Sequence, residues 1–240
     1  MIRFVAETGS TSGDLAARLR AGEAVPEGDW LVADRQTAGR GRGGREWFDG
    51  SGNFMGSTVI HLRFGDPEPA TLALVAGLAV HQAVSAHLPP DRQALLKWPN
   101  DVMIGGAKLA GILMERQGDA IIVGVGVNLR AAPAVPGRET VALAAMGTAP
   151  DRDGFALSLS ESFEQEVGRW RGFGVAPIVQ RWLAAAHPVG TPLLVGEPGE
   201  ESLAGTFAGL TDSGVLQLRL ADGVTRAIHA GEVRFADPDR

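Results

Sequence analysis

Residues Ala33–Trp47 read ADRQTAGRGRGGREW, and this segment decides how the rest of the chain is interpreted. It contains four arginines and four glycines. Glycine loses the most backbone freedom on folding and like charges repel, so the segment is not expected to become ordered without a partner. Guanidinium groups and backbone N–H groups bind carboxylates and phosphates. The segment therefore predicts a loop that closes over a small anionic ligand and shields it from water.

Within this segment, Gly39–Gly44 matches the dinucleotide fingerprint G-x-G-x-x-G. That fingerprint requires a strand before it and a helix that opens on its last glycine. The following residues, Arg45–Gly52, read REWFDGSG and are not expected to open a helix, so we reject a dinucleotide site. Trp47 indicates instead that the loop stacks on a flat heterocycle. A solvated basic loop anchored by a core tryptophan is the alternative.

The composition excludes several classes of function. The chain has 240 residues and a net charge of −6, which argues against a general nucleic-acid binder. It has no cysteine, which excludes disulfides, thiol catalysis and cysteine–metal sites. No signal peptide is recognisable, and the apolar segment Thr71–Val84 is too short to span a bilayer, so a cytoplasmic protein is expected. No protein-ligated metal is predicted, because the five histidines lack the spacing of metal ligands. They are His61, His81, His87, His187 and His229.

Two residue types are unusually rare. The only lysines among 22 basic residues are Lys97 and Lys108, and the only asparagines are Asn53, Asn100 and Asn128. The ammonium group of lysine and the neutral amide of asparagine are hard to replace. We therefore expect the few lysines and asparagines at positions where arginine, aspartate or glutamine could not do the same work. Chance survival explains any single one of them, but explains poorly that four of the five lie between positions 97 and 128.

The chain order predicts a mixed α+β domain. Pro69–Leu88 is apolar nearly all round, which indicates a buried helix, and Gln117–Asp119 indicates a hairpin turn. Glu7–Ser12 is expected to be a turn. Strands are expected over Ile2–Val5, Trp30–Ala33, Asn53–Phe64, Leu95–Trp98, Val102–Ile104, Lys108–Arg116 and Ala120–Asn128, and the other helices over Gly13–Arg20, Asp151–Arg171 and Pro177–Ala186.

The character of the sequence changes at His187–Pro192, which reads HPVGTP. Beyond it, about five short strands are expected up to Phe235, separated by turns at Glu197–Gly199, Thr211–Gly214 and Ala221–Gly223. Short strands joined by tight turns predict a small barrel. We therefore expect two domains, residues 1–187 and 188–240.

Two further segments could carry chemistry. Lys97–Asp101 reads KWPND and offers a lysine, an amide and a carboxylate at a strand end; a capped turn with a Lys–Asp ion pair is the alternative. Gly105–Gly111 surrounds Lys108 but lacks the spacing of a Walker A motif. Lys108 could point into a cleft, or could protect a strand edge. Asn128, at the end of its strand, could bind an adenine edge or an adjacent turn.

Taken together, these segments resemble the biotin–protein ligase family. The resemblance covers nearly the whole chain and rests on five short segments in the family's order, followed by the expected barrel: Gly9–Ser12, Gln36–Trp47, Lys97–Asp101, Lys108–Leu113 and Gly124–Asn128. It implies a mixed β-sheet with packed helices, as in class II synthetases, and an SH3-like barrel after it. It also implies that biotin and ATP, with Mg²⁺, form biotinyl-5′-adenylate, and that biotin passes to a lysine of a biotin carboxyl carrier protein.

The resemblance assigns roles residue by residue. The biotin site would comprise Ser10, Thr11, Ser12, Gln36, Gly39, Arg40, Lys108, Gly111 and Ile112. Of these, Ser10, Thr11 and Gln36 would form hydrogen bonds with the ureido head. The ATP and adenylate site would comprise Arg42, Arg45, Trp47, Lys97, Asn100, Lys108 and Asn128. The catalytic groups would be Lys108, Arg40, Lys97 and Asp101, with Asp101 orienting or deprotonating the acceptor amine. No metal is expected to be held by protein ligands.

Two positions depart from the family pattern. Ser12 stands where asparagine is usual, which predicts a weaker or water-mediated head contact. Gly43 replaces a usual arginine, which predicts a looser loop and leakage of the intermediate. Because the chain starts directly at the expected catalytic domain, we expect no DNA-binding repressor function and no membrane association. An exposed strand edge near Lys108–Arg116 would permit a homodimer.

Three rival functions remain open from the sequence. A lipoate ligase or other acyl-adenylate transferase would use the same scaffold, although a dithiolane head does not need the polar Ser10–Ser12 cluster. An RNA clamp at Arg35–Arg45 would show strong salt dependence, but the net charge and the absence of tyrosine disfavour it. A catalytically inactive biotin sensor would bind the same ligand.

Overall fold

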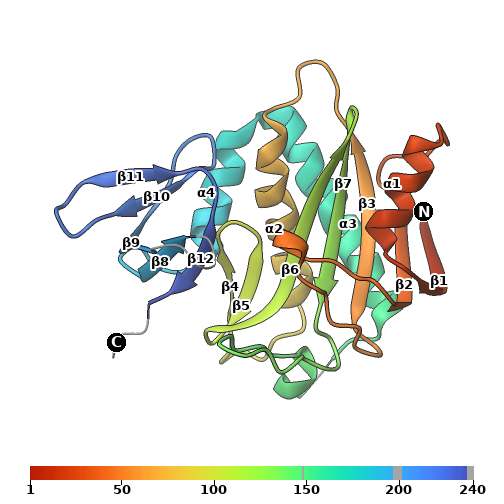
Figure 1. Ribbon diagram of the computed structural model, residues 1–240, viewed down its shortest axis with the longest axis horizontal. Helices are drawn as coiled ribbons and strands as arrows, with labels where there is room; N and C mark the ends of the chain where they lie inside the picture. The colour runs from red at the N-terminus through yellow and green to blue at the C-terminus, as the bar shows by residue number, and fades with distance from the viewer. Residues whose placement is uncertain (148, 197–201, 237–240) are drawn as a thin grey trace.

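The computed structural model describes residues 1–147, 149–196 and 202–236. Their strands form two separate sheets, one of seven strands and one of five. The smaller sheet lies at one end of the larger domain, beside the helix α4 (Val175–Ala185) (Figure 1). The mixed α+β class and the C-terminal β domain expected from the sequence are confirmed.

The larger sheet has the order β1-β2-β3-β7-β6-β5-β4. Its strands are β1 (Ile2–Thr8), β2 (Trp30–Gln36), β3 (Phe54–His61), β4 (Ala94–Lys97), β5 (Asp101–Ile104), β6 (Ala107–Gln117) and β7 (Ala120–Val127). β1 and β2 are parallel, and the other neighbouring pairs are antiparallel. Parallel neighbours need a crossover connection, and α1 (Thr11–Arg20) supplies it.

Alternation along the central strands explains why both faces of this sheet are covered. Leu31 and Val59 belong to a buried cluster with Leu15 of α1, whereas the next residues along, Val32 and Ile60, belong to the main core on the opposite face. Successive side chains of a strand point to opposite faces. Because apolar side chains point to both faces of β2 and β3, these strands lie between two layers of helix.

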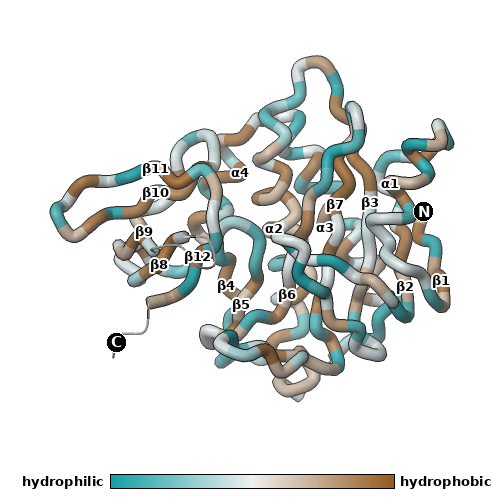
Figure 2. The backbone as a smooth tube through the Cα atoms, viewed as in Figure 1, coloured by the Kyte–Doolittle hydropathy of each residue, from teal (hydrophilic) through white to brown (hydrophobic). Residues whose placement is uncertain are grey.

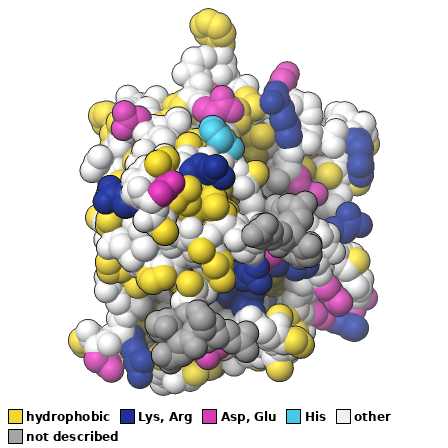
Figure 3. Space-filling model, turned by 60° about the vertical axis from the view of Figure 1, so that its left-hand side comes forward, with side chains coloured by type: hydrophobic (Ala, Val, Ile, Leu, Met, Phe, Trp, Pro, Cys, Tyr) yellow, Lys and Arg dark blue, Asp and Glu magenta, His cyan; other side chains and the backbone are white. Residues whose placement is uncertain are grey.

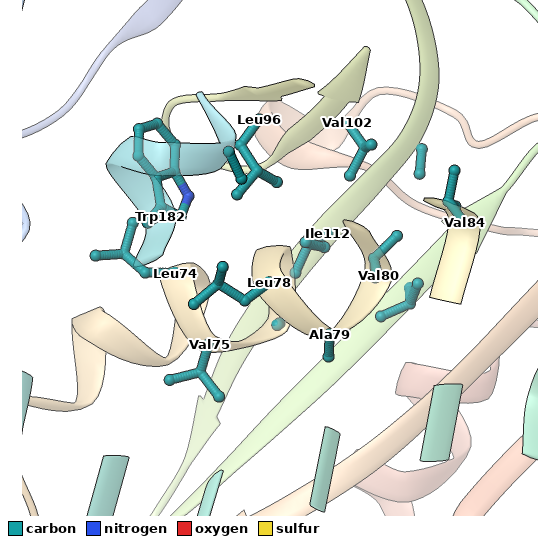
Figure 4. Packing of buried hydrophobic residues seen from close by; sticks show 14 of the residues in the cluster. Leu74, Val75, Leu78, Ala79, Val80, Val84, Leu96, Val102, Ile112 and Trp182 are labelled. Atoms are coloured by element: carbon teal, nitrogen blue, oxygen red, sulfur yellow. The ribbon is translucent and has the colours of Figure 1, made fainter. Parts of the chain in front are cut away.

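The main core is built around α2 (Leu72–Ser85), which packs against α3 (Arg152–Phe173) and α4. Ten of its 14 residues are buried, as its all-round apolar sequence predicted. Figure 4 shows its side chains among Leu96, Val102 and Ile112 of the sheet and Trp182 of α4. Hydrophobic segments follow α2 and β7 in Figure 2. The sheet is thereby a rigid floor for the loops at its ends.

The C-terminal sheet contains the five short strands that the turn signals predicted. They are β8 (Pro192–Gly196), β9 (Leu203–Leu210), β10 (Leu216–Arg219), β11 (Thr225–Ile228) and β12 (Glu232–Phe235), in the order β11-β10-β9-β8-β12. The expected boundary near residue 188 falls in the connection between α4 and β8. The turn expected at Glu197–Gly199 lies outside the described residues.

The strand ends near the N-terminus differ from the prediction. Glu7 and Thr8, expected in a turn, continue β1 and pair with Arg35 and Gln36 at the end of a longer β2. Parallel pairing satisfies their backbone groups, but Glu7 and Arg35 are exposed, so no apolar pattern marks this extension. The extension carries Gln36 to the start of α1, where the pocket begins.

The strand edge expected over Lys108–Arg116 is only partly present. β5 pairs with β6 from Ala107 to Gly111, so the end of β6 that carries Lys108 is covered. This pairing was missed because the tight turn at Gly105 and Gly106, both at positive φ, folds β5 directly back onto β6. In the described part of the chain, no helix is long and apolar enough to cross a membrane.

Candidate active site

One pocket of about 640 Å³ opens at the ends of β2, β5, β6 and β7, between the arginine-rich loop and β12. This volume is typical of a site for a small molecule or cofactor. Of the site residues predicted from the sequence, all except Gly39 line it. Gly39 instead packs against two lining residues, Gln36 and Trp47. A Cβ atom on Gly39 would be 3.1 Å from Gln36 Nε2 and 3.3 Å from the carbonyl oxygen of Trp47.

One end of the pocket is a cluster of hydroxyl and amide groups. Ser10 caps α1, and its neighbours Thr11 and Ser12 are buried in the first turn. Gln36 accepts hydrogen bonds from the backbone N–H of Thr11 at 2.8 Å and from its hydroxyl at 3.1 Å. Ser57 of β3 lies 2.7 Å from Thr11 Oγ1 and 2.8 Å from Ser12 Oγ. This end can therefore bind a polar head that both donates and accepts hydrogen bonds.

At the pocket floor the two lysines share one carboxylate. Asp101 lies 3.0 Å from Lys97 Nζ and 2.6 Å from Lys108 Nζ. Burial disfavours its charge, but the charges and hydrogen bonds of Lys108 and Lys97 outweigh burial and hold the pKa of Asp101 well below its usual range. Burial lowers the pKa of Lys108, which Asp101 only partly offsets. Two cations facing one carboxylate leave a net positive floor that can receive an anion.

Trp47 forms another wall of the pocket. Its indole ring packs against two glycines, Gly111 of β6 and Gly126 of β7. A Cβ atom on Gly126 would lie 2.2 Å from the indole ring, and one on Gly111 would lie 2.9 Å from it. The indole N–H is buried and has no partner among the described residues. Lys108 Nζ lies 5.7 Å from the centroid of the ring. The absence of side chains at both glycines thus leaves room for the indole ring, whose remaining surface lines the pocket.

Asn128 lines the pocket directly after the end of β7. Its Nδ2 donates to the Val141 carbonyl at 3.2 Å, whereas its Oδ1 is buried without a partner among residues the structure describes. A buried unsatisfied acceptor is costly unless a ligand fills it. Asn100 differs, because its amide accepts from Arg42 at 3.2 Å and donates to the Ile112 carbonyl.

The arginine-rich loop is paired rather than unpartnered, which differs from the expectation for an isolated basic segment. Arg45 Nη1 lies 2.8 Å from Glu232 Oε1, and Arg42 Nη2 donates to the Gly231 carbonyl at 3.4 Å. The sequence could not indicate this, because these partners come from the C-terminal domain, 187 residues beyond Arg45. Figure 3 shows Lys and Arg side chains gathered in a hollow of the face on this side of the molecule.

Among the polar pocket residues that sequence reasoning missed are Ser57, Arg138 and Glu232. Arg138 also pairs with Glu232, and Lys97 Nζ donates to the Val233 carbonyl at 2.9 Å. Burial disfavours the charge of Glu232, but its hydrogen bond to Arg45 and nearby cations lower its pKa. No motif marks these positions. Two signals could have pointed to them. The alternation of side chains along β3 gives the face on which Ser57 lies, and Arg138 belongs to the loop that follows the pocket strand β7.

Asn53, the fifth of the rare lysines and asparagines, is structural. Its Oδ1 accepts from the backbone N–H groups of Arg130 and Ala131, and its Nδ2 donates to the Ala131 carbonyl at 2.8 Å. An amide is needed here because the same side chain both donates and accepts. It thereby fixes the start of the loop that carries Arg138. Among the described residues no three histidine or acidic side chains group as metal ligands.

Comparison with known proteins agrees with this geometry. Residues 11–129 match the biotin/lipoate A/B protein ligase family, and residues 195–235 match the biotin protein ligase C-terminal domain. A biotin–[acetyl-CoA-carboxylase] ligase of Paracoccus denitrificans is 37% identical over 97% of this chain and 99% of its own. One of Mycobacterium tuberculosis is 36% identical over 95% and 86%.

A solved structure extends the likeness to three dimensions. The biotin protein ligase from Aquifex aeolicus in complex with biotin and ATP superposes with a TM-score of 0.85 and 26% identity, covering 98% of this chain and 99% of that one. The likeness therefore includes both sheets. The chain belongs to the biotin protein ligase family.

Proposed function

We propose that the protein is a biotin–[acetyl-CoA-carboxylase] ligase. It activates biotin with ATP to give biotinyl-5′-AMP and pyrophosphate, and then transfers biotin to a lysine of a biotin carboxyl carrier protein. The observation that carries the proposal is the pair of lysines at Asp101, placed between a hydrogen-bonding head subsite and an arginine-rich loop. This arrangement suits the meeting of a carboxylate and a polyphosphate.

The first step must bring two anions together. Lys108 lines the pocket beside both Asp101 and Trp47, so it neutralises the biotin carboxylate and the α-phosphate where they react. Arg40 supports the carboxylate, and Arg42, Arg45 and Lys97 bind the phosphates. Adenine stacks on the Trp47 indole, whose ring packs over Gly111 and Gly126. Catalysis on this proposal is positioning together with charge stabilisation in a site shielded from water.

Magnesium would accompany the nucleotide. Two carboxylates at the phosphate end, Asp101 and Glu232, are each engaged by two cations. Mg²⁺ usually keeps waters and binds through substrate phosphates with one or two carboxylates. The donor set therefore fits an ion held mainly by ATP oxygens, where it would neutralise phosphate charge.

The second step needs the adenylate kept from water until an amine arrives. Segment Arg40–Trp47 covers the pocket and performs this shielding. The lowered pKa of Asp101 makes it a poor proton acceptor, so of its two expected roles we favour orienting the acceptor amine. A homodimer, the domain limits 1–187 and 188–240, and the absence of DNA binding stay predictions.

The test is the exchange of labelled pyrophosphate into ATP by the purified protein. We expect exchange that depends on biotin, and labelled biotin transferred to an added carrier domain. Lipoate should not replace biotin, because the polar cluster at Thr11 and Gln36 has no counterpart in a dithiolane. Exchange supported by lipoate alone would assign the chain to the other branch of its family, and biotin binding without exchange would make it a sensor.

A further inference from the structure

A chain of buried hydrogen bonds runs beneath the polar end of the pocket. It joins Ser12, Ser57, Thr11 and Gln36, whose exposed fractions are 7%, 0%, 2% and 8%. The links are 2.8 Å from Ser12 Oγ to Ser57 Oγ, 2.7 Å from Ser57 Oγ to Thr11 Oγ1 and 3.1 Å from Thr11 Oγ1 to Gln36 Oε1. The three hydroxyl groups have one proton each, so the direction of every link can be worked out.

The direction is fixed from the Gln36 end. The backbone N–H of Thr11 can only donate, and it lies 2.8 Å from Gln36 Oε1. The amide oxygen must therefore face α1, and the amide nitrogen must face away from it. The Thr11 hydroxyl meets the same oxygen, which can only accept, so Thr11 commits its single proton to Gln36.

The remaining links follow from that commitment. Because the Thr11 proton is used, Ser57 must donate to Thr11, and because the Ser57 proton is then used, Ser12 must donate to Ser57. A serine hydroxyl can rotate to donate or to accept, but here Ser12 has no proton left for the pocket. Its oxygen presents only lone pairs, while Gln36 Nε2 presents only N–H groups.

We propose that Ser57 is a positioning residue that sets this polarity, and that the polarity selects a head with a carbonyl beside a ring N–H. The inference rests on the proposed function, because the ureido ring of biotin has this pattern. Its carbonyl accepts from Gln36 Nε2, and one ring N–H donates to Ser12 Oγ. Ser57 acts through Ser12 and Thr11, since both of its own links are inside the protein.

This polarity has a measurable consequence for isosteres. A site that meets a ligand N–H with a fixed acceptor rejects an analogue with an oxygen there, because two acceptors then face each other without a proton. If Ser57 loses its hydroxyl, Ser12 can turn its own proton toward the pocket. The oxygen analogue then gains a donor, and natural biotin loses its fixed acceptor.

The experiment uses biotin and its two carbamate isosteres, in which one or the other ureido N–H is replaced by a ring oxygen. Biotin-dependent ATP–pyrophosphate exchange gives KM and kcat for each. We expect the wild type to disfavour at least one isostere by roughly 100-fold in kcat/KM. Ser57→Ala should reduce that preference roughly tenfold, through a higher KM for biotin, with the KM for ATP unchanged.

Thr58→Ala is the matched control. Thr58 is the next residue of β3, is equally buried, and its hydroxyl donates to the Asp29 carbonyl at 2.8 Å, on the other face of the sheet. It should keep the wild-type preference even if it lowers stability. Ser57→Cys keeps a similar shape and a weak S–H donor, so it should give an intermediate preference and serves if Ser57→Ala does not fold.

The outcomes separate the two proposals. An unchanged preference in folded Ser57→Ala or Ser57→Cys overturns the role of Ser57 while biotin-dependent exchange by the wild type upholds the function. An equal loss of preference in Thr58→Ala also overturns it, because a general packing effect would then suffice. If the wild type shows no biotin-dependent exchange, the proposed function fails and this inference fails with it.

Discussion

Lys108 is the residue on which the proposed chemistry depends most, because it lies beside both Asp101 and Trp47. In Lys108→Ala the reacting carboxylate and phosphate lose the cation nearest to them, and Asp101 retains only Lys97. We expect adenylate formation to fall at least 10²–10³-fold, which is about the effect of removing one group that stabilises a transition state. Biotin-dependent pyrophosphate exchange measures it. Exchange at the normal rate would refute the role.

His187 gives a prediction at the residue scale that concerns stability. Its ring packs edge-on against Phe207 and Phe235, with centroids 5.5 and 4.8 Å away. Burial, assisted by the charge of Lys97, lowers the pKa of His187 from 6.5 to about 4. The unfolded chain therefore binds a proton between pH 6.5 and 4 that the folded chain does not, so stability is fully present above pH 6.5 and is lost as the pH falls.

We expect the free energy of unfolding to fall by roughly 1 kcal/mol per pH unit across this window on account of His187. Urea denaturation of the wild type and of His187→Gln between pH 7 and pH 4 measures it, and the variant should show a flatter profile. His229→Gln is the control, because His229 is an exposed histidine of the adjoining C-terminal domain. Identical slopes for the wild type and His187→Gln would contradict the assignment.

At the residue scale, the sequence indicated which side chains have unusual chemistry but not what they contact. The rarity of lysine singled out Lys97 and Lys108, and both line the pocket. The ion pair of Lys97 with Asp101 was the alternative kept for that segment, and it is present. The pairing of Lys108 with Asp101 was not predicted, because it depends on β5 folding directly onto β6. Ser57 was missed because the alternation of β3 gives only the face on which it lies, and not the helix residues that it contacts there.

At the scale of elements, the arginine-rich loop should hold the adenylate in the pocket. Arg45 connects the loop to Glu232, and Arg42 connects it to Asn100 and Gly231. In Arg45→Ala the loop loses its ion pair with β12 and a phosphate ligand. We expect free biotinyl-5′-AMP to escape roughly tenfold faster, since a weakened lid opens more often. Biotin deposited on a bystander protein's lysines measures the escape.

Arg35→Ala is the matched control for this loop. Arg35 belongs to the same basic segment, but its guanidinium pairs with Glu7 at 3.0 Å and Asp49 at 3.2 Å, and it does not line the pocket. Losing it removes the same charge without touching the lid. Equal labelling by Arg35→Ala and Arg45→Ala would show that net charge, rather than closure, governs escape.

Elements were predicted well wherever burial creates a pattern. The all-apolar α2 and the β6–β7 hairpin have the expected type and place, because packing requires their residues. The end of β1 was missed, since its residues Glu7 and Thr8 are held by backbone pairing with β2 and not by burial. The pairing of the loop with the C-terminal domain was beyond prediction, because no local pattern links segments so far apart in the chain.

At the scale of the whole molecule, the C-terminal domain contributes to the site. The backbone of Gly231 and Val233 accepts from Arg42 and Lys97, and Trp98 Nε1 donates to the Gly214 carbonyl at 3.2 Å. Glu232 places a carboxylate between Arg45 and Arg138, at the proposed phosphate end of the pocket. In the protein without nucleotide, this carboxylate occupies cations that the polyphosphate would use.

Glu232→Gln should therefore strengthen nucleotide binding while it weakens the attachment of the domain. The change frees Arg45 and Arg138, whose pairs with Glu232 are partly exposed, so we expect roughly fivefold tighter binding of ATP, an effect that salt reduces. The thermal midpoint should fall by a few degrees. Glu139→Gln, an exposed carboxylate on the same loop as Arg138, makes the same change in net charge and should alter neither quantity. Calorimetric titration with ATP at low and high salt measures the affinity. Weaker binding by Glu232→Gln would contradict the prediction, because it would mean that the carboxylate holds the two arginines in position for the phosphates instead of competing with the phosphates.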